Sequence, residues 1–394
     1  MIFNTLVYYL LFLVPAALLF RTVPVRWAPW TCAISGCAFF VYFSITAVGG
    51  YAGAFCLLIF VWESIFSRFY RKGSWLCLAG IAQAVLFLFI FKYWNFFTGE
   101  FSHLLGRPDN TWKWTGAFLP LGISFFTFEF IHYAVDRYHG RTEAGKFREY
   151  LAFILFFPTM VAGPIKRYQD FLPKLRAPSR DWALDWSRGI TRILTGLVKK
   201  FAVADFMTAL TNHLNRSDMA AAQRWILPVW LLAYGIKIYF DFSAYSDIAI
   251  GSARLFGIVV PENFDWPYFR ANIAEFWRHW HISLYRWLVD YIFIPMGGSR
   301  VRPSLVYRNV LLTMLLSGLW HGAGLNFLVW GLWHGVLLCL HRLWRRWRPA
   351  PLNPTWFHVF ACWLLTFVCV NLGWAFFAMD LPTALFFFQR LFLG

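Results

Sequence analysis

Three histidines in one apolar stretch are the residues of this sequence best suited to chemistry. Residues 309–341 contain no Asp, Glu, Lys or Arg, but they include His321, His334 and His341. Glycines at positions 318, 322 and 324 surround His321, and such a cluster indicates a helix break or a close backbone approach. Because an ionisable residue in so apolar a segment suggests function, we expect His321 to be functional. For His334 the sequence supports a structural role and a functional role equally. His341 is expected at the membrane interface.

Neutral imidazole at position 321 would suit general-base chemistry. A hydroxyl that attacks a thioester must lose its proton as the new bond forms, and a base with a pKa near the working pH removes it most effectively. Burial disfavours imidazolium and so keeps the base unprotonated. The alternative is a structural histidine that is bonded to the carbonyl of a neighbouring helix.

The segment Ala271–Tyr291, ANIAEFWRHWHISLYRWLVDY, offers a second histidine of interest. Its apolar residues recur at helical spacing, which predicts one amphipathic helix in the membrane interface or across the bundle. His279 falls on the polar face, whereas His281 falls at the edge of the apolar stripe. His281 is therefore either a boundary residue with one hydrated ring nitrogen or a polar group that orients a base or stabilises a developing oxyanion.

A further apolar segment, 237–251 (KIYFDFSAYSDIAIG), contains two carboxylates, Asp241 and Asp247. Buried carboxylates need partners. We favour a structural role for both, in ion pairs with Lys237 or Arg254.

The segment Phe156–Tyr168, FFPTMVAGPIKRY, contains helix-breaking residues at 158, 163 and 164, and Lys166 and Arg167 follow directly. These two cations could receive phosphate groups, or they could mark an ordinary cytoplasmic helix end. No metal site is expected, because neither the histidines nor the seven cysteines have metal-ligand spacing.

The composition identifies lipid as the solvent of these segments. Of 394 residues, 59% are hydrophobic and 14% are charged, whereas a soluble domain carries about a quarter charged residues. The net charge of +17 is typical of positively charged cytoplasmic loops and of attraction to anionic lipids. Nucleic acid is not expected as a partner, because no basic stripe accompanies a soluble fold.

Eleven apolar segments are candidates to enter the membrane, since about 20 apolar residues cross a bilayer as a helix. They are Leu6–Phe20, Pro29–Ala47, Tyr51–Phe66, Ser74–Trp94, Gly116–Val135, Tyr150–Ala162, Gly189–Thr211, Ile226–Ala249, Leu305–Leu319, Phe327–Leu343 and Trp356–Phe377. The Tyr150 segment is short and could be re-entrant. Lys and Arg follow the first, third and fifth segments, which predicts that the N-terminus lies outside.

Six stretches together resemble the membrane-bound O-acyltransferase family, in particular the alginate-acetylating members of its bacterial polysaccharide branch. They occur in the family's order. The stretches are LPLGISFFTFEFIHYAVDRYHG (119–140), FFPTMVAGPIKRY (156–168), KIYFDFSAYSDIAIG (237–251), PENFDWPYF (261–269), EFWRHWHISLYRWLVDYIFIPMGGSR (275–300) and GLWHGAGLNFLVWGLWHG (318–335). The sequence departs from that branch at His279, commonly Arg, and at Ala244, commonly Gly.

This resemblance implies an all-α, multi-span integral membrane bundle. It would contain about 10–11 membrane-embedded helical segments and a central funnel or tunnel. We expect a single domain over residues 1–394, with N-terminal spans in 1–117, a catalytic core in 118–343, and a C-terminal span and tail in 344–394.

The resemblance also implies a reaction and a location. We expect transfer of an acetyl group from cytoplasmic acetyl-CoA to an extracytoplasmic polysaccharide, directly or through an SGNH-hydrolase-like acetyltransferase partner. The expected location is the bacterial cytoplasmic (inner) membrane, with no permanently bound cofactor. The family's invariant histidine falls on His321, and its second polar position, commonly Asn in eukaryotic relatives, falls on His281. Candidates to bind the donor are Trp277, Arg278, Trp280, Lys166 and Arg167.

Three alternatives to this reaction stay open, of which the last is a scaffold that has lost activity. The first is D-alanyl transfer from a charged carrier protein to teichoic acid, as in a sister branch. The second is a transporter or channel without catalysis, in which the histidines relay protons.

Overall fold

The computed structural model describes residues 2–48, 50–105, 112–114, 118–348 and 354–393. These residues are organised as helices, and no strand occurs among them, which confirms the all-α prediction. The chain forms two compact units: Met1–Leu197 with Tyr245–Pro261, and Val198–Ala244 with Glu262–Gly394. The predicted division at residue 117 falls outside the described residues, as does the start of the Gly116–Val135 segment.

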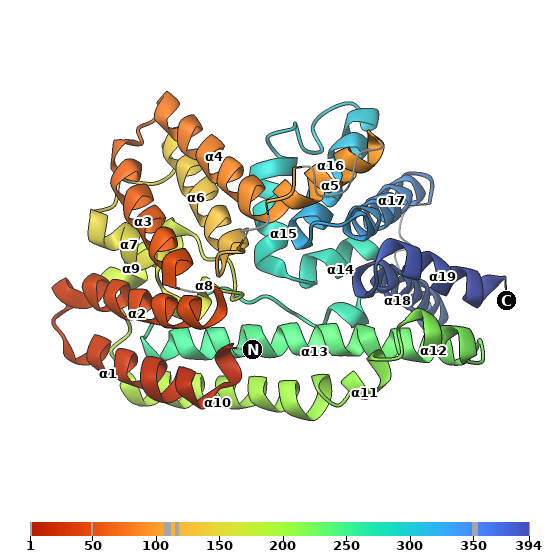
Figure 1. Ribbon diagram of the computed structural model, residues 1–394, viewed down its shortest axis with the longest axis horizontal. Helices are drawn as coiled ribbons and strands as arrows, with labels where there is room; N and C mark the ends of the chain where they lie inside the picture. The colour runs from red at the N-terminus through yellow and green to blue at the C-terminus, as the bar shows by residue number, and fades with distance from the viewer. Residues whose placement is uncertain (1, 49, 106–111, 115–117, 349–353, 394) are drawn as a thin grey trace. The chain divides into compact units, whose positions relative to one another are not determined.

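The first unit holds the N-terminal helices (Figure 1). They are α1 (Val14–Thr22), α2 (Ala28–Val48), α3 (Gly50–Phe66), α4 (Trp75–Leu88), α5 (Trp94–Leu104), α6 (Ile123–Tyr138), α7 (Phe147–Ile154), α8 (Phe157–Met160), α9 (Tyr168–Arg176) and α10 (Trp182–Val198). Helix α4 packs along α6, and α2 packs against α3 and α7. Helix breaks were predicted at Pro158 and at Gly163 and Pro164. The first interruption instead precedes Pro158, because α7 ends at Ile154 and Pro158 lies in the first turn of α8. Helix α8 ends at Met160, before Gly163, as the second prediction requires.

Aromatic side chains fill the core of the first unit. Phe39 stacks on Phe157 at a centroid distance of 5.1 Å, and Phe256 packs edge-on against Phe156 and Phe157. The high aromatic content of the sequence therefore serves packing between helices as well as contact with lipid.

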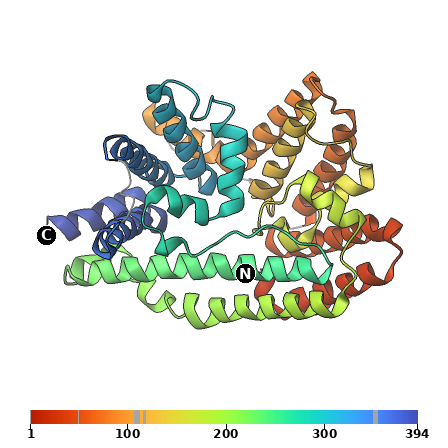
Figure 2. The same ribbon diagram turned by 180° about the vertical axis from the view of Figure 1, so that it is seen from behind.

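A buried ion cluster joins three helices of this unit. Asp185 of α10 is completely buried and lies 2.7 Å from Arg21 of α1 and 2.8 Å from Arg254. Arg254 belongs to α13 (Ile226–Leu255), whose residues from 245 onwards form part of the first unit. Beside this cluster, α10 runs along the end of α13 (Figure 2), where Gly189 and Gly251 allow close backbone contact.

The second unit contains the first part of α13 and the C-terminal helices. These are α11 (Thr208–Thr211), α12 (Arg216–Ala221), α14 (Ile273–His279), α15 (Ile282–Leu288), α16 (Pro303–His321), α17 (Leu325–Trp347), α18 (Trp356–Ala378) and α19 (Leu381–Phe392). Helices α16 and α17 form a tightly packed antiparallel pair, and α18 packs on α17 (Figure 1). Thr355 and Asp380 cap α18 and α19, because their side chains accept hydrogen bonds from the first-turn N–H groups.

Five helices of the described ranges are long and apolar enough to cross a membrane. They are Val25–Thr46, Trp75–Glu100, Ile226–Leu255, Leu325–Trp347 and Trp356–Ala378. The other predicted segments correspond to helices that are shorter or more polar, and their entry into the membrane stays a prediction. The same holds for the central funnel and for the single-domain organisation.

Candidate functional site

The segment 271–291 is broken at His281, so the prediction of one continuous helix is wrong there. Helix α14 ends at His279, Trp280 is extended, and His281 adopts φ 46° and ψ 55° before α15 begins. This left-handed conformation is uncommon for residues other than glycine, although His, Asn and Asp adopt it more often than others. The break removes position 281 from the helical face on which the sequence placed it.

His281 is buried and surrounded by aromatic rings. Only 1% of the residue is exposed. The Phe242 ring lies 4.7 Å from the imidazole and the Trp320 ring 6.1 Å from it, both edge-on. Neither ring nitrogen has a hydrogen-bond partner among the described residues, and both nitrogens are buried.

His321 is the last residue of α16, and the break predicted from its glycine neighbours is confirmed. Gly322 is extended and ends α16, while Gly324 precedes the first residue of α17. The partly buried imidazole lies 4.8 Å from the Trp320 ring and 5.0 Å from both Trp330 and Phe377. Trp320 is therefore a neighbour of both imidazoles, at positions 281 and 321.

Two glycines set the position of His321, because they let α16 and α17 touch through their backbones. A Cβ atom on Gly318 would lie 2.2 Å from the carbonyl oxygen of Phe327, and one on Gly331 would lie 2.4 Å from that of Met314. Any side chain at either position would push the two helices apart. The Gly-rich stretch thus serves both the break and the helix contact.

The other two histidines of the segment have different surroundings. His334 is completely buried between the rings of Trp277 and Trp330, at 5.0 and 5.1 Å. Neither of its nitrogens has a partner among the described residues. His341 lies one helical turn before Arg345, at the basic end of α17.

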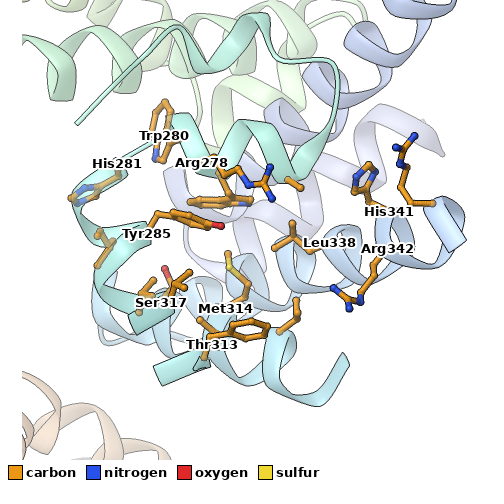
Figure 3. A pocket seen from close by; sticks show the side chains of 18 residues that line it. Arg278, Trp280, His281, Tyr285, Thr313, Met314, Ser317, Leu338, His341 and Arg342 are labelled. Carbon is orange, nitrogen blue, oxygen red and sulfur yellow. The ribbon is translucent and has the colours of Figure 1, made fainter. Parts of the chain in front are cut away.

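A cavity of about 310 Å³ lies within the second unit. Its walls come from α14, α15, α16 and α17 and include Trp277, Arg278, Trp280 and His281. Figure 3 shows His281 at one end of the cavity and His341 and Arg342 at the opposite end. His321 is not one of the residues that line it.

The end opposite His281 is basic. His341 and Arg342 of α17 lie there (Figure 3), and Arg345 of the same helix also lines the cavity. In this view Arg278 of α14 lies between them and His281, and its guanidinium donates to Glu275 at 2.6 Å. Between the two ends the walls are mostly apolar. We did not predict Arg342 and Arg345 as site residues. Arg345 follows His341 by four residues and Arg342 by three, so it shares a face of α17 with each of them.

Lys166 and Arg167, the remaining candidates for donor binding, lie in the first unit. Lys166 is 2% exposed; its ammonium lies 2.5 Å from Glu129 and over the Phe153 ring. Arg167 is partly buried and immediately precedes α9. Lys166 thus has a carboxylate partner within the protein, and donor binding by this pair stays a prediction.

The carboxylates of α13 have structural partners, as expected, but these partners are not the predicted ones. Asp241 lies 2.8 Å from Lys200, and Asp247 lies 2.6 Å from Arg192. Lys237 instead donates to the Thr211 hydroxyl. The described residues contain no group of three or more His, Cys, Asp or Glu side chains that could hold a metal ion.

Comparison with known proteins identifies the family. Residues 138–378, more than half of the chain, match the MBOAT, membrane-bound O-acyltransferase family. The chain belongs to this family. The matched range contains His281, His321 and every residue that lines the cavity.

Curated relatives place the chain near bacterial O-acetyltransferases. It is 38% identical over 78% of its length to the probable alginate O-acetylase AlgI of Pseudomonas aeruginosa, covering 58% of that protein. It is 35% identical over 96% of its length to the AlgI of Azotobacter vinelandii, covering 75%. It is 33% identical over 80% of its length to the peptidoglycan O-acetyltransferase of Helicobacter pylori, covering 64%. The chain therefore spans about half to three quarters of the length of these relatives.

Proposed function

We propose that this membrane protein is an O-acetyltransferase that moves an acetyl group from acetyl-CoA towards an extracytoplasmic polysaccharide. The observation that carries the proposal is one cavity, in an MBOAT-family chain, with arginines at one end and a buried histidine at the other. Relatives named as acetylases of alginate and peptidoglycan support a polysaccharide acceptor. Transfer is either direct or through an SGNH-hydrolase-like partner outside the membrane.

The polarity of the cavity fits an acyl donor with a phosphate-bearing head and a long arm. Guanidinium groups bind phosphates through paired, charge-assisted hydrogen bonds, which fits Arg278, Arg342 and Arg345. The apolar walls formed by Leu284, Met314 and Leu338 suit the arm. In this arrangement the thioester extends towards the His281 end.

The proposed reaction uses His321 as the general base. Its imidazole takes the proton of the acceptor hydroxyl while the oxygen attacks the thioester carbonyl. The new C–O bond forms, the C–S bond breaks, and the proton goes to the departing thiolate. Burial lowers the pKa of His281 to about 3, so this ring is neutral and suited to polarising or orienting rather than to carrying charge.

The proposed location is the bacterial cytoplasmic membrane, with the N-terminus outside. Positive charge in short loops marks the cytoplasmic side. The end of α17 carries Arg342, Arg345 and Arg346, so it is expected at the cytoplasmic face. The basic end of the cavity would then be accessible to cytoplasmic acetyl-CoA.

The deciding experiment measures thioester cleavage by the purified full chain in liposomes. Labelled acetyl-CoA is supplied with alginate or peptidoglycan stripped of O-acetyl groups, and free CoA and labelled polymer are followed. We expect acceptor-dependent CoA release, and a loss of at least about 100-fold in His321→Ala, the scale of losing one general base. Normal turnover by a folded His321→Ala protein would refute the role of His321.

The same assay separates the alternatives. A D-alanyl transferase would leave acetyl-CoA intact and would consume a D-alanyl carrier protein. A transporter or channel would cleave neither thioester and would instead carry protons across the liposome membrane.

A further inference from the structure

The turn at His281 requires support from another part of the chain. Among the described residues other than glycine, only Trp266 and His281 have a positive φ, a conformation that crowds the Cβ atom. His281 also occupies the N-cap position of α15, but its side chain accepts no capping hydrogen bond. The first N–H groups of α15 therefore need acceptors from elsewhere.

Asn263 supplies these acceptors from a segment that precedes α14. Its backbone carbonyl accepts the Ile282 N–H at 2.9 Å. Its side-chain oxygen accepts the Ser283 N–H at 3.2 Å and the Ser283 hydroxyl at 2.6 Å. Asn263 is completely buried. These three hydrogen bonds, which we call the Asn263 clamp, cap α15 from outside the helix.

Neighbouring residues continue the same antiparallel contact. Phe264 and Trp280 form a β-bridge, and their rings meet edge-on at 5.2 Å. The Asp265 N–H donates to the carbonyl of His279 at 3.1 Å. The backbone on both sides of His281 is therefore attached to residues 263–265.

The clamp also determines where the imidazole lies. Phe242 packs edge-on against both His281 and Phe264, at 4.7 and 5.1 Å. Neither imidazole nitrogen has a hydrogen-bond partner among the described residues. The ring is thus oriented by the backbone turn and by aromatic packing rather than by hydrogen bonds of its own.

We propose that Asn263 is a positioning residue for the reaction: it holds the left-handed turn that presents the His281 imidazole. This proposal rests on the function proposed above for His281. Asn263 itself would touch neither donor nor acceptor, and its effect on turnover would pass entirely through residue 281.

Asn272 provides a matched control. It caps α14, the helix that precedes His281, because its side-chain oxygen accepts the Glu275 N–H at 2.9 Å. It has the same chemistry as Asn263, but it makes none of the hydrogen bonds of the clamp.

The experiment compares Asn263→Ala with Asn272→Ala in the full chain, by turnover, KM for acetyl-CoA and amide hydrogen exchange. For Asn263→Ala we expect kcat to fall at least about tenfold, because small displacements of a catalytic group are costly. KM should stay within about twofold, since the basic end of the cavity is unchanged. Exchange should accelerate at Ile282 and Ser283. For Asn272→Ala, exchange should accelerate at Glu275, with kcat unchanged.

A double variant distinguishes positioning from general destabilisation. If Asn263 acts through His281, adding Asn263→Ala to His281→Ala should lower residual kcat no further. A further loss equal to that of the single variant would overturn the proposal, as would equal kcat in Asn263→Ala and Asn272→Ala. Wild-type turnover by His281→Ala would instead refute the proposed function of His281.

A milder variant covers the case in which Asn263→Ala does not fold. Ser283→Ala removes the 2.6 Å hydrogen bond and keeps the two clamp bonds that the backbone N–H groups of residues 282 and 283 donate to Asn263. We expect a smaller loss of kcat, again absent in the His281→Ala background. Wild-type kcat in Ser283→Ala, together with unchanged exchange at Ile282, would overturn the proposal.

Discussion

The backbone at His281 lies in a region of conformational space that suits few side chains. A residue there must tolerate a left-handed φ, fit among Phe242 and Trp320, and still provide a polar group. Histidine and asparagine meet the first condition better than most residues. The geometry of the turn therefore restricts the side chains that can occupy this position.

The His281→Gly variant should be more stable towards unfolding than the His281→Ala variant. Both substitutions remove the imidazole and leave a similar void, but only alanine retains the crowded Cβ atom. We expect His281→Gly to exceed His281→Ala by about 1 kcal/mol in unfolding free energy. Chemical unfolding in detergent micelles measures the difference. Greater stability of the alanine variant would show that the turn relaxes when the imidazole is lost.

Arg345 should contribute to donor binding, whereas its neighbour Arg346 should not. Both are exposed residues of one helical turn, but only Arg345 lines the cavity. Loss of one charge-assisted contact to phosphate corresponds to about a tenfold change in affinity. We expect Arg345→Ala to raise KM for acetyl-CoA by about that factor. Equal KM values for Arg345→Ala and Arg346→Ala would argue against phosphate binding at this end of the cavity.

At the residue scale, the sequence was informative about His321 and much less so about His281. The glycines around His321 are local signals, and the predicted break occurs at Gly322. The turn at His281 depends on hydrogen bonds to Asn263, a distant residue whose role no periodicity reveals. A helical pattern in 271–291 therefore predicted continuity where a tertiary contact imposes a break.

The α16–α17 pair depends on small residues at its contact. Gly331 leaves the backbone of Met314 within reach of α17. Close approach of this kind is a main source of helix association in membranes, where hydrophobic burial contributes little. The pair also carries His321 at its turn, so the stability and the geometry of the site share one contact.

Gly331→Ala should destabilise the protein, whereas Gly99→Ala should not. An added Cβ at position 331 meets backbone at 2.4 Å, while no described atom lies within 4 Å of one at Gly99 in α5. We expect a loss of about 1–3 kcal/mol for Gly331→Ala from overpacking. Gly99→Ala should be neutral or stabilising by up to about 1 kcal/mol, from helix propensity. Thermal unfolding in one detergent compares them, and equal melting temperatures would contradict the backbone contact.

The Asp185 cluster should make stability depend on pH. Burial raises the pKa of Asp185, but hydrogen bonds and charge from Arg21, Ser179 and Arg254 outweigh burial and hold it below its usual range. A depressed pKa stabilises the folded state above the unfolded value, and this contribution is lost as pH falls through the folded value.

Asp185→Asn tests this dependence. At neutral pH we expect the variant to be less stable by about 3 kcal/mol, because two arginines lose their carboxylate partner. Below about pH 4, near the ordinary pKa of Asp, the difference from the parent protein should begin to shrink. Unfolding measured between pH 7 and pH 3 shows this trend. A constant difference across that range would mean that the effect is steric rather than electrostatic.

At the element scale, the structural role predicted for Asp241 and Asp247 was correct in kind but wrong in partner. The sequence neighbours Lys237 and Arg254 were proposed, whereas Lys200 and Arg192 are the actual partners. Ion pairs between helices depend on which faces meet, and one sequence alone does not specify that. Length and hydropathy, in contrast, are intrinsic to a helix, so α17 and α18 were placed to within a few residues.

For the whole molecule, the apolar composition was sufficient to predict an integral membrane protein. Five long apolar helices and the match to the MBOAT family agree with the membrane assignment made from hydropathy. Eleven segments were predicted because every apolar run was counted, whereas several are short or interrupted helices, such as α7 and α8. A short buried helix and a membrane span have similar composition, so they differ mainly in length.

The predicted orientation can be tested on intact cells. Reporter domains that are active only in the periplasm or only in the cytoplasm are fused at two sites. One site is ahead of residue 2, and the other is after Gly73, which follows Arg71 and Lys72. We expect the Gly73 fusion to be active only with the cytoplasmic reporter, and the N-terminal fusion only with the periplasmic one. The reverse pattern would refute the predicted orientation of the N-terminus.

The Asn263 clamp also bears on the order in which the chain can assemble. It joins residues only 20 apart, whereas Asn326 reaches across 50 residues to Phe376 and Trp363 across 95 to Tyr268. Closing a short loop costs less chain entropy than closing a long one, and local contacts form faster. A ribosome that has synthesised the chain through α15 has therefore already supplied both residues of every hydrogen bond in the Asn263 clamp. Trp320, which packs against the His281 ring, follows only with α16.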